Sequence, residues 1–514
     1  MTPTDLAGTT RSGPLTACQR ELYALDALAP DPRTLNLAYA LHIEGPLDIA
    51  AFREALRDVV RAHEPLRTRY GVHNGAVTAT VADPELAAAV FALPRIQVHG
   101  MAEAADYARR DRDRAFDLAS EPPLRAALLD SGDGRHVLLL CLHHIAADGW
   151  SIDLLVRQIS RAYTMRHTSG VPPLGPKYEC LDQAAEQQQW LASPQAAAEG
   201  EWWAQHVAEA DPRPLSEHGP AAPERGEGLT RYSVSVPDGV TASLRSLSRE
   251  ATVSLYSVMT AAYAGLLHLW TGTQRPLIGT LVAGRTTARA GEILGAHYNP
   301  VPLAADLSGD PSLAECVLRA GAVTVSVLDH QTLPYPVLAR RLERAGVWDA
   351  RRMPQTAFIM DRYPPENLRL NGCDTTGLYL DGPTEDTATS LEGGGTFARV
   401  PCATSADLTF AVRDAGGHLT ISAFHRPAVV DGAFVLGALE RYLDLLAGLG
   451  DAPYTPLGAF EPVMPVSSTF DSPVAGSGST GPSLRLVGMH SPFEAISPVG
   501  HWSSPILNQG LGGI

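Results

Sequence analysis

A continuous apolar run, followed by two histidines and a helical pattern, constrains the fold of this chain more than any other feature. Residues 137–142 are all apolar, which is typical of a strand buried on both faces. The run His143-His144-Ile145-Ala146-Ala147-Asp148-Gly149 follows. An apolar stripe at helical spacing comes next, at Ile152, Leu155, Val156, Ile159 and Tyr163. Ser151 is the expected cap of this helix. The sequence therefore predicts a loop held between a buried strand and an anchored helix.

Alternating strand and helix patterns fill both halves of the chain and predict an α/β protein with mixed sheets. A chain of 514 residues is too long for one simple core, so we expect two lobes. The expected division is a first lobe over 1–175, a bridge rich in Pro, Glu and Gln over 176–228, and a second lobe over 229–450. Residues 451–514 are rich in Pro, Gly and Ser and predict an extension.

Composition excludes several classes of function. Apolar content of 45% and charged content of 19% are typical of a globular protein, and the net charge of -16 argues against a nucleic-acid partner. No apolar stretch is long enough for a transmembrane helix, and the N-terminus has no signal-peptide core, so no membrane partner is expected. The cysteines are scattered, which indicates reduced thiols and a cytoplasmic protein.

Three interpretations of the histidine pair remain open from the residues alone. Both imidazoles could be structural and satisfied by backbone groups. A metal site of His143, His144 and Asp148 is disfavoured, because adjacent strand residues point to opposite faces and no other His/Cys cluster has ligand spacing. One histidine could instead be a general base, since its unperturbed pKa of about 6.5 lies close to working pH. We expect neither a metal nor a bound cofactor.

Several motifs resemble those of condensation domains of nonribosomal peptide synthetases, in the chloramphenicol-acetyltransferase-like superfamily. Residues 143–149 fit the HHxxxDG signature at every fixed position. Residues 15–23 resemble the opening S-x-A-Q-x-R-L-W motif, degraded at its first residue and at the Trp, and residues 61–70 resemble R-H-E-x-L-R-T-x-F. Residues 282–286, 294–299 and 330–336 follow in the family's order. The resemblance covers about residues 14–450 and implies two acetyltransferase-like lobes in a V-shaped pseudo-dimer, with a tunnel between them.

The resemblance also implies roles for individual residues. His144 is the expected catalytic histidine, and His143 braces the loop. Asp148 is expected to form an ion pair, with Arg285 as the first candidate partner and Arg67 as the second. Gly149 is expected to keep the backbone close to the tunnel. Ser151, or backbone N–H groups, could stabilise an oxyanion.

The implied reaction transfers an acyl or aminoacyl group from a carrier-protein thioester to an amine, with the substrate on the 4'-phosphopantetheine arm. Ester formation on a hydroxyl acceptor, including a soluble small molecule, is one alternative. A recruitment or scaffold module without turnover is another. The expected partners are peptidyl or acyl carrier proteins, and an arginine patch offers a possible contact at Arg340, Arg341, Arg344, Arg351 and Arg352.

Overall fold

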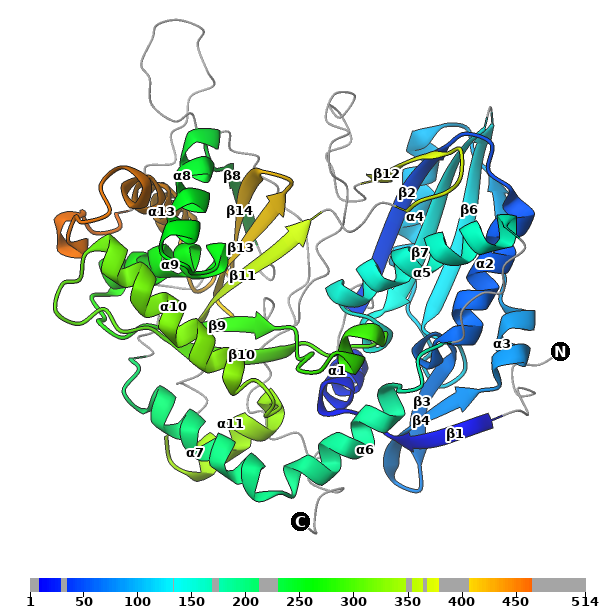
Figure 1. Ribbon diagram of the computed structural model, residues 1–514, viewed down its shortest axis with the longest axis horizontal. Helices are drawn as coiled ribbons and strands as arrows, with labels where there is room; N and C mark the ends of the chain where they lie inside the picture. Colours follow the sequence, from blue (N-terminus) through cyan, green and yellow to red (C-terminus); the bar gives the residue numbers. More distant parts are fainter. Residues whose placement is uncertain are drawn as a thin grey trace, which may run out of the picture.

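The computed structural model describes residues 9–28, 35–132, 134–168, 175–211, 230–347, 354–363, 368–378 and 406–464. The chain forms a mixed α/β protein with two lobes, which spread in a V on either side of α1 (Ala17–Leu28) (Figure 1). The predicted fold class and two-lobed arrangement are confirmed.

The first lobe is built on a five-stranded sheet of order β12-β2-β7-β6-β5. The strands β2 (Asn36–Glu44), β7 (Arg135–His143) and β6 (Leu124–Gly132) are antiparallel, and β5 (Arg95–Gln97) runs parallel to β6. Leu138, Leu140 and Leu142 of β7 pack with α2 (Ile49–Ala62) and α5 (Gly149–His167). Val137 and Leu139 pack on the opposite face with α4 (Met101–Arg112). Burial on both faces therefore explains the continuous apolar run.

A smaller antiparallel sheet lies at the base of the first lobe. Its order is β1-β4-β3, with β1 (Thr9–Pro14), β4 (Ala76–Ala82) and β3 (Thr68–His73). The short turn η2 (Glu64–Arg67) leads into β3, and α3 (Pro84–Val90) follows β4. The small sheet, α1 and the loop after β7 share one apolar cluster, so the base of the lobe supports the histidine loop.

The second lobe contains a six-stranded mixed sheet of order β10-β9-β11-β13-β14-β8. Its strands are β10 (Asn299–Ala304), β9 (Leu277–Val282), β11 (Thr356–Tyr363), β13 (Leu408–Ala415), β14 (His418–His425) and β8 (Thr230–Ser235). Its helices are α8 (Asp238–Glu250), α9 (Leu255–Thr271), α10 (Leu313–Asp329), α11 (Tyr335–Arg344) and α13 (Gly432–Asp451). The aromatic ring of Tyr263 on α9 packs against Phe358, Phe410 and Tyr442 at the centre of this lobe.

The connections between the lobes are partly helical. The bridge over 176–228 contains α6 (Cys180–Leu191), which begins with a capping box, and α7 (Pro194–Ala208), whose cap is Ser193. In addition, β12 (Asp374–Leu378) pairs with β2 and so belongs to the sheet of the first lobe, although it lies within 229–450. The second half of the chain thus completes the first lobe.

The chain after α13 returns to the second lobe. Leu457 in η6 (Leu457–Ala459) and Val463 are buried in its core. The expected extension over 451–514 therefore begins with a packed segment, and residues 465–514 lie outside the described residues. Within the described ranges, no single helix is long and apolar enough to cross a membrane, and one bent pair, α8 with α9, meets the criteria of length and composition only.

Candidate active site

The histidine loop leaves β7 and enters α5 at the junction of the two lobes. The strand ends at His143, the turn η3 (His144–Ala146) follows, and α5 begins at Gly149. The cap of this helix is Asp148, whose carboxylate accepts a hydrogen bond from the Ser151 backbone N–H at 2.8 Å. The expectation that Ser151 caps the helix is therefore wrong, because the helix starts two residues before it.

His143 is held on both sides of its ring. Its Nδ1 accepts a hydrogen bond from the backbone N–H of Ile145 at 3.1 Å, so Nε2 carries the proton and donates to Asp26 Oδ1, also at 3.1 Å. Phe116 packs edge-on against the imidazole. Both ring nitrogens are thus occupied, and the geometry is that of a residue that braces the loop.

His144 is oriented quite differently. Its imidazole is 2% exposed, and Nδ1 lies 2.8 Å from the carbonyl oxygen of Ala147. This nitrogen therefore carries the proton in the neutral ring, and Nε2 keeps its lone pair. Among the described residues, none forms a hydrogen bond with Nε2. The ring is fixed in the tautomer that a general base requires.

The surroundings of His144 also favour its neutral form. Burial, the largest effect, disfavours the imidazolium and lowers the pKa of His144 below its ordinary value. The backbone of His144 itself, the carboxylate of Asp148 and the hydrogen bond to Ala147 act in the opposite direction but are weaker. The environment therefore favours the neutral imidazole over the imidazolium.

This leads to a prediction for titration. With ¹³Cε1-labelled histidine, the NMR signal that disappears in His144→Gln should titrate with a midpoint below 6.5, the ordinary value. The neutral form is needed for a base, so the side chain should remain competent at a lower pH than a free histidine. A midpoint above 6.5 would show that the charged form is stabilised, which contradicts the described environment.

Asp148 is buried, and its carboxylate is surrounded by donors. Arg285 Nη2 lies 3.0 Å from Oδ1 and 3.2 Å from Oδ2, the Ser151 hydroxyl lies 2.7 Å from Oδ1, and the His297 backbone N–H donates to Oδ2 at 3.0 Å. Burial raises the pKa of the carboxyl, but Arg285 and the Ser151 donors outweigh it and hold the pKa of Asp148 below its usual value. Asp148 is thus an ionised partner that joins the lobes.

Two glycines allow the second lobe to reach this ion pair. Gly284 has φ +62°, and a Cβ on it would lie 1.8 Å from the His297 carbonyl oxygen. Gly295 has φ +143°, and a Cβ there would lie 2.6 Å from Cys180 Sγ. Both positions need glycine for backbone conformation and for space. The sequence motifs around residues 284 and 295 therefore place Arg285 and His297 against Asp148.

The other candidate residues have different environments. Arg67, the second candidate partner of Asp148, instead donates to the carbonyl oxygen of Ala82 within the first lobe. The Ser151 hydroxyl is fully buried and contacts Asp148, Arg285 and Gly295. The suggestion that Ser151 stabilises an oxyanion is therefore wrong, because its one proton is already used within the ion-pair network.

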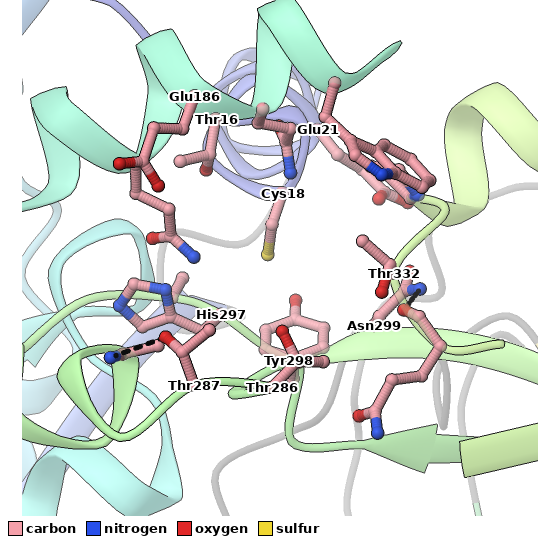
Figure 2. A pocket seen from close by; sticks show the side chains of 18 of the residues that line it. Thr16, Cys18, Glu21, Glu186, Thr286, Thr287, His297, Tyr298, Asn299 and Thr332 are labelled. Carbon is pink, nitrogen blue, oxygen red and sulfur yellow. Dashed lines mark hydrogen bonds between the residues drawn. The ribbon is translucent and has the colours of Figure 1, made fainter. Parts of the chain in front are cut away.

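A pocket of about 220 Å³ lies beside this site, and residues of both halves line it (Figure 2). Cys18 on α1 and Tyr298 in the approach to β10 point toward one another across it. The ring of Tyr298 lies 5.1 Å from that of His144, measured between centroids. Tyr298 thus connects the catalytic candidate to the pocket.

The described residues contain no group of three or more His, Cys, Asp or Glu side chains arranged to hold a metal ion. The arginine patch is also only partly available to a partner. Arg341 donates to the carbonyl oxygen of Ala196 on α7, whereas Arg344 is exposed near the end of α11. Arg351 and Arg352 lie outside the described residues.

The model of one protein family, the condensation domain, matches residues 10–465. The chain belongs to the condensation-domain family. Phosphinothricin tripeptide synthetase PhsB of Streptomyces viridochromogenes is 34% identical over 342 residues, 65% of this chain and 28% of that protein. The dimodular nonribosomal peptide synthase of Bacillus subtilis is 32% identical over 371 residues, 70% of this chain and 15% of that protein. The chain thus spans less than a third of either relative.

Solved condensation domains share the fold. The condensation domain of the monacolin K polyketide synthase MokA superposes with a TM-score of 0.71 at 20% identity, covering 88% of this chain and 100% of that one. The first condensation domain of the calcium-dependent antibiotic synthetase, in complex with a substrate analogue, gives a TM-score of 0.68 at 21% identity, covering 88% and 98%. At this identity the likeness shows the fold alone.

Sequence reasoning missed several residues of this condensation domain that contact the site. Asp26 holds His143, Tyr298 packs against His144, and the His297 backbone binds Asp148. Residues 297 and 298 lie within the motif at 294–299, so the sequence indicated that they matter. It did not indicate which residues they contact. Nothing in the sequence around Asp26 indicates its pairing with a residue 117 positions away.

Proposed function

We propose that this condensation domain joins an acyl or aminoacyl group to an amine acceptor and forms an amide. The donor is presented as a thioester on the 4'-phosphopantetheine arm of a carrier protein. The observation that carries the proposal is the tautomer of His144, whose protonated Nδ1 is held by Ala147 while Nε2 keeps its lone pair. This geometry supports a base, and the family supports acyl transfer as the reaction class.

The steps of the reaction follow from this geometry. The amine nitrogen adds to the thioester carbonyl carbon, which forms the C–N bond, and Nε2 of His144 accepts the proton that the nitrogen loses. Collapse of the tetrahedral adduct breaks the C–S bond. The proton then passes from His144 to the departing sulfur, so the imidazole returns to its starting form. The ion pair of Asp148 with Arg285 holds the loop and takes no part in the proton transfer.

Partners and compartment follow from the same proposal. A loaded carrier protein supplies the thioester, and the acceptor arrives on a second carrier or as a free small molecule. The described cysteines are thiols, which is in keeping with a reaction in the reducing cytoplasm.

Intact-mass spectrometry of loaded carrier proteins tests this function directly. Candidate acyl-carrier thioesters are incubated with the protein and with matched amine and alcohol acceptors. Loss of the acyl group from the carrier, with an amide product that requires the protein, is the expected result. An ester product alone would replace the proposed bond type. Unchanged carrier mass with every donor and acceptor would favour a recruitment role without turnover.

Gly149 provides a steric test of substrate access. A Cβ at this position meets no protein atom within 4 Å, and its φ lies outside the left-handed region, so the fold itself does not need glycine here. We expect Gly149→Leu to keep its melting temperature while kcat/KM for the carrier-bound substrate falls about 10-fold or more, because misplacement of a substrate at this scale is costly. Gly149→Ala should give a kcat/KM between that of the wild-type protein and that of Gly149→Leu. An unchanged kcat/KM for Gly149→Leu would show that no substrate passes close to this position.

A further inference from the structure

The pocket beside Tyr298 carries an acidic side chain that the proposed mechanism does not use. Cys18 and Glu21 lie three residues apart on α1, so they share one face of the helix, and both line the pocket (Figure 2). The opposite walls come from α6 and from the chain entering β10. Because Cys18 faces Tyr298 across the pocket and Tyr298 packs on His144, this face of α1 borders the space next to the reacting groups.

The carboxylate of Glu21 has no counterpart in the protein. Within the ranges that the structure describes, no side chain or backbone group forms a hydrogen bond or ion pair with it. Burial, the sole cause, raises the pKa of Glu21 to about 7. Glu21 is partly buried, so its carboxylate loses part of its hydration and gains no protein partner in return. The pocket therefore contains an acidic group that no described residue neutralises.

A second carboxylate in the same pocket serves as a contrast. Glu186 on α6 accepts a hydrogen bond from the Tyr178 hydroxyl at 2.8 Å and lies 3.3 Å from Arg289 Nη2. Its charge is already compensated by the protein. Glu21 is thus set apart from Glu186 by its lack of a partner and not merely by its acidity.

We propose that this pocket is a subsite for the acceptor substrate, and that Glu21 binds a cationic group of that acceptor, an ammonium or a guanidinium. The inference rests on the proposed function. The attacking amine must lose its positive charge before it adds to the thioester, so the cation held by Glu21 is a second group of the acceptor. An acceptor with a basic side chain satisfies both requirements.

Equilibrium binding tests the subsite without any donor. Calorimetric titration with pentylamine and with its neutral analogue 1-pentanol should give the wild-type protein a Kd about 10- to 100-fold lower for the amine, the range of a charge-assisted hydrogen bond. Glu21→Gln, which is isosteric, should bring the two values together, and Glu21→Asp should retain part of the difference. Glu186→Gln should retain it fully. Equal values in the wild-type protein would overturn the proposal.

A kinetic comparison separates this inference from the proposed function. With a carrier-bound acyl donor, the N-acetylcysteamine thioesters of lysine and of 2-aminoheptanoic acid are compared as acceptors, because they differ only in a terminal ammonium against a methyl group. The wild-type protein should favour the lysyl acceptor through a lower KM, and Glu21→Gln should lose this preference at similar kcat. Condensation without this preference would refute the subsite and leave the proposed function standing. Amine binding that depends on Glu21, without any condensation, would refute the proposed function and leave the subsite standing.

Discussion

Replacing His144 by alanine is expected to leave a folded protein that turns over about 10²- to 10⁴-fold more slowly, the usual contribution of a positioned general base. The loss follows from removal of Nε2, the ring nitrogen without a hydrogen-bond partner among the described residues. Intact-mass assays of acyl transfer give the rate, and the melting temperature checks the fold. The effect should be larger with a hydroxyl acceptor than with an amine, because an alcohol depends more on deprotonation.

His143→Ala is the matched control for this variant. The ring of His143 is held by Asp26 and by the Ile145 backbone, so its loss should lower the melting temperature and the yield of folded protein. Normal turnover by well-folded His144→Ala would remove the assignment of His144 as the base. Equal loss of activity at full stability in both variants would assign catalysis to the pair.

Asp148→Ala should lower the free energy of unfolding by about 3–5 kcal/mol, because removing one member of a buried ion pair leaves the other charge uncompensated. The side chains of Arg285 and Asp148 are 2% and 7% exposed, so solvent screens this pair weakly. Arg285→Ala should lower the free energy of unfolding by at least as much. It also removes the hydrogen bonds that Arg285 donates to the carbonyl oxygens of Ala290 and Ile293. Urea denaturation of the two single variants and the double variant measures the coupling.

The double variant should be no less stable than Arg285→Ala alone. Glu54→Ala is the control, since Glu54 pairs with Arg57 on a partly exposed helix face, and ion pairs near the surface contribute about 0–1 kcal/mol. If Asp148→Ala were inactive at full stability, Asp148 would take part in the chemistry and its structural role would be refuted.

The strand, loop and helix of the site could be predicted because each has a local signal. The apolar run of β7 and the apolar stripe of α5 predict buried residues, and both are buried in the structure. The start of α5 was misplaced because Asp148 and Ser151 are both good caps by type, and only the geometry shows which one accepts the hydrogen bond. Arg285 could be predicted as a partner of Asp148 only because it lies in a family motif.

Other elements could not be predicted because their signals conflict with their structure. The strand β10 contains Pro300 and Pro302, which argue against a strand. The prolines are tolerated because, among the described strands, β10 lies at the edge of its sheet and pairs with β9 alone. For β12 the sequence around residues 374–378 indicates a strand but cannot reveal that its partner is β2, more than 300 residues earlier.

The pairing of β12 with β2 has a consequence for synthesis on the ribosome. β2 gains β7 on one edge once residue 143 has emerged, but its other edge waits for residues 374–378. At about 5–20 residues per second this interval lasts roughly 10–50 s. During that time a largely apolar strand exposes unpaired backbone groups, which can template pairing with another chain. The nascent first lobe therefore depends on protection until its last strand arrives, and a fragment that stops before β12 keeps that open edge permanently.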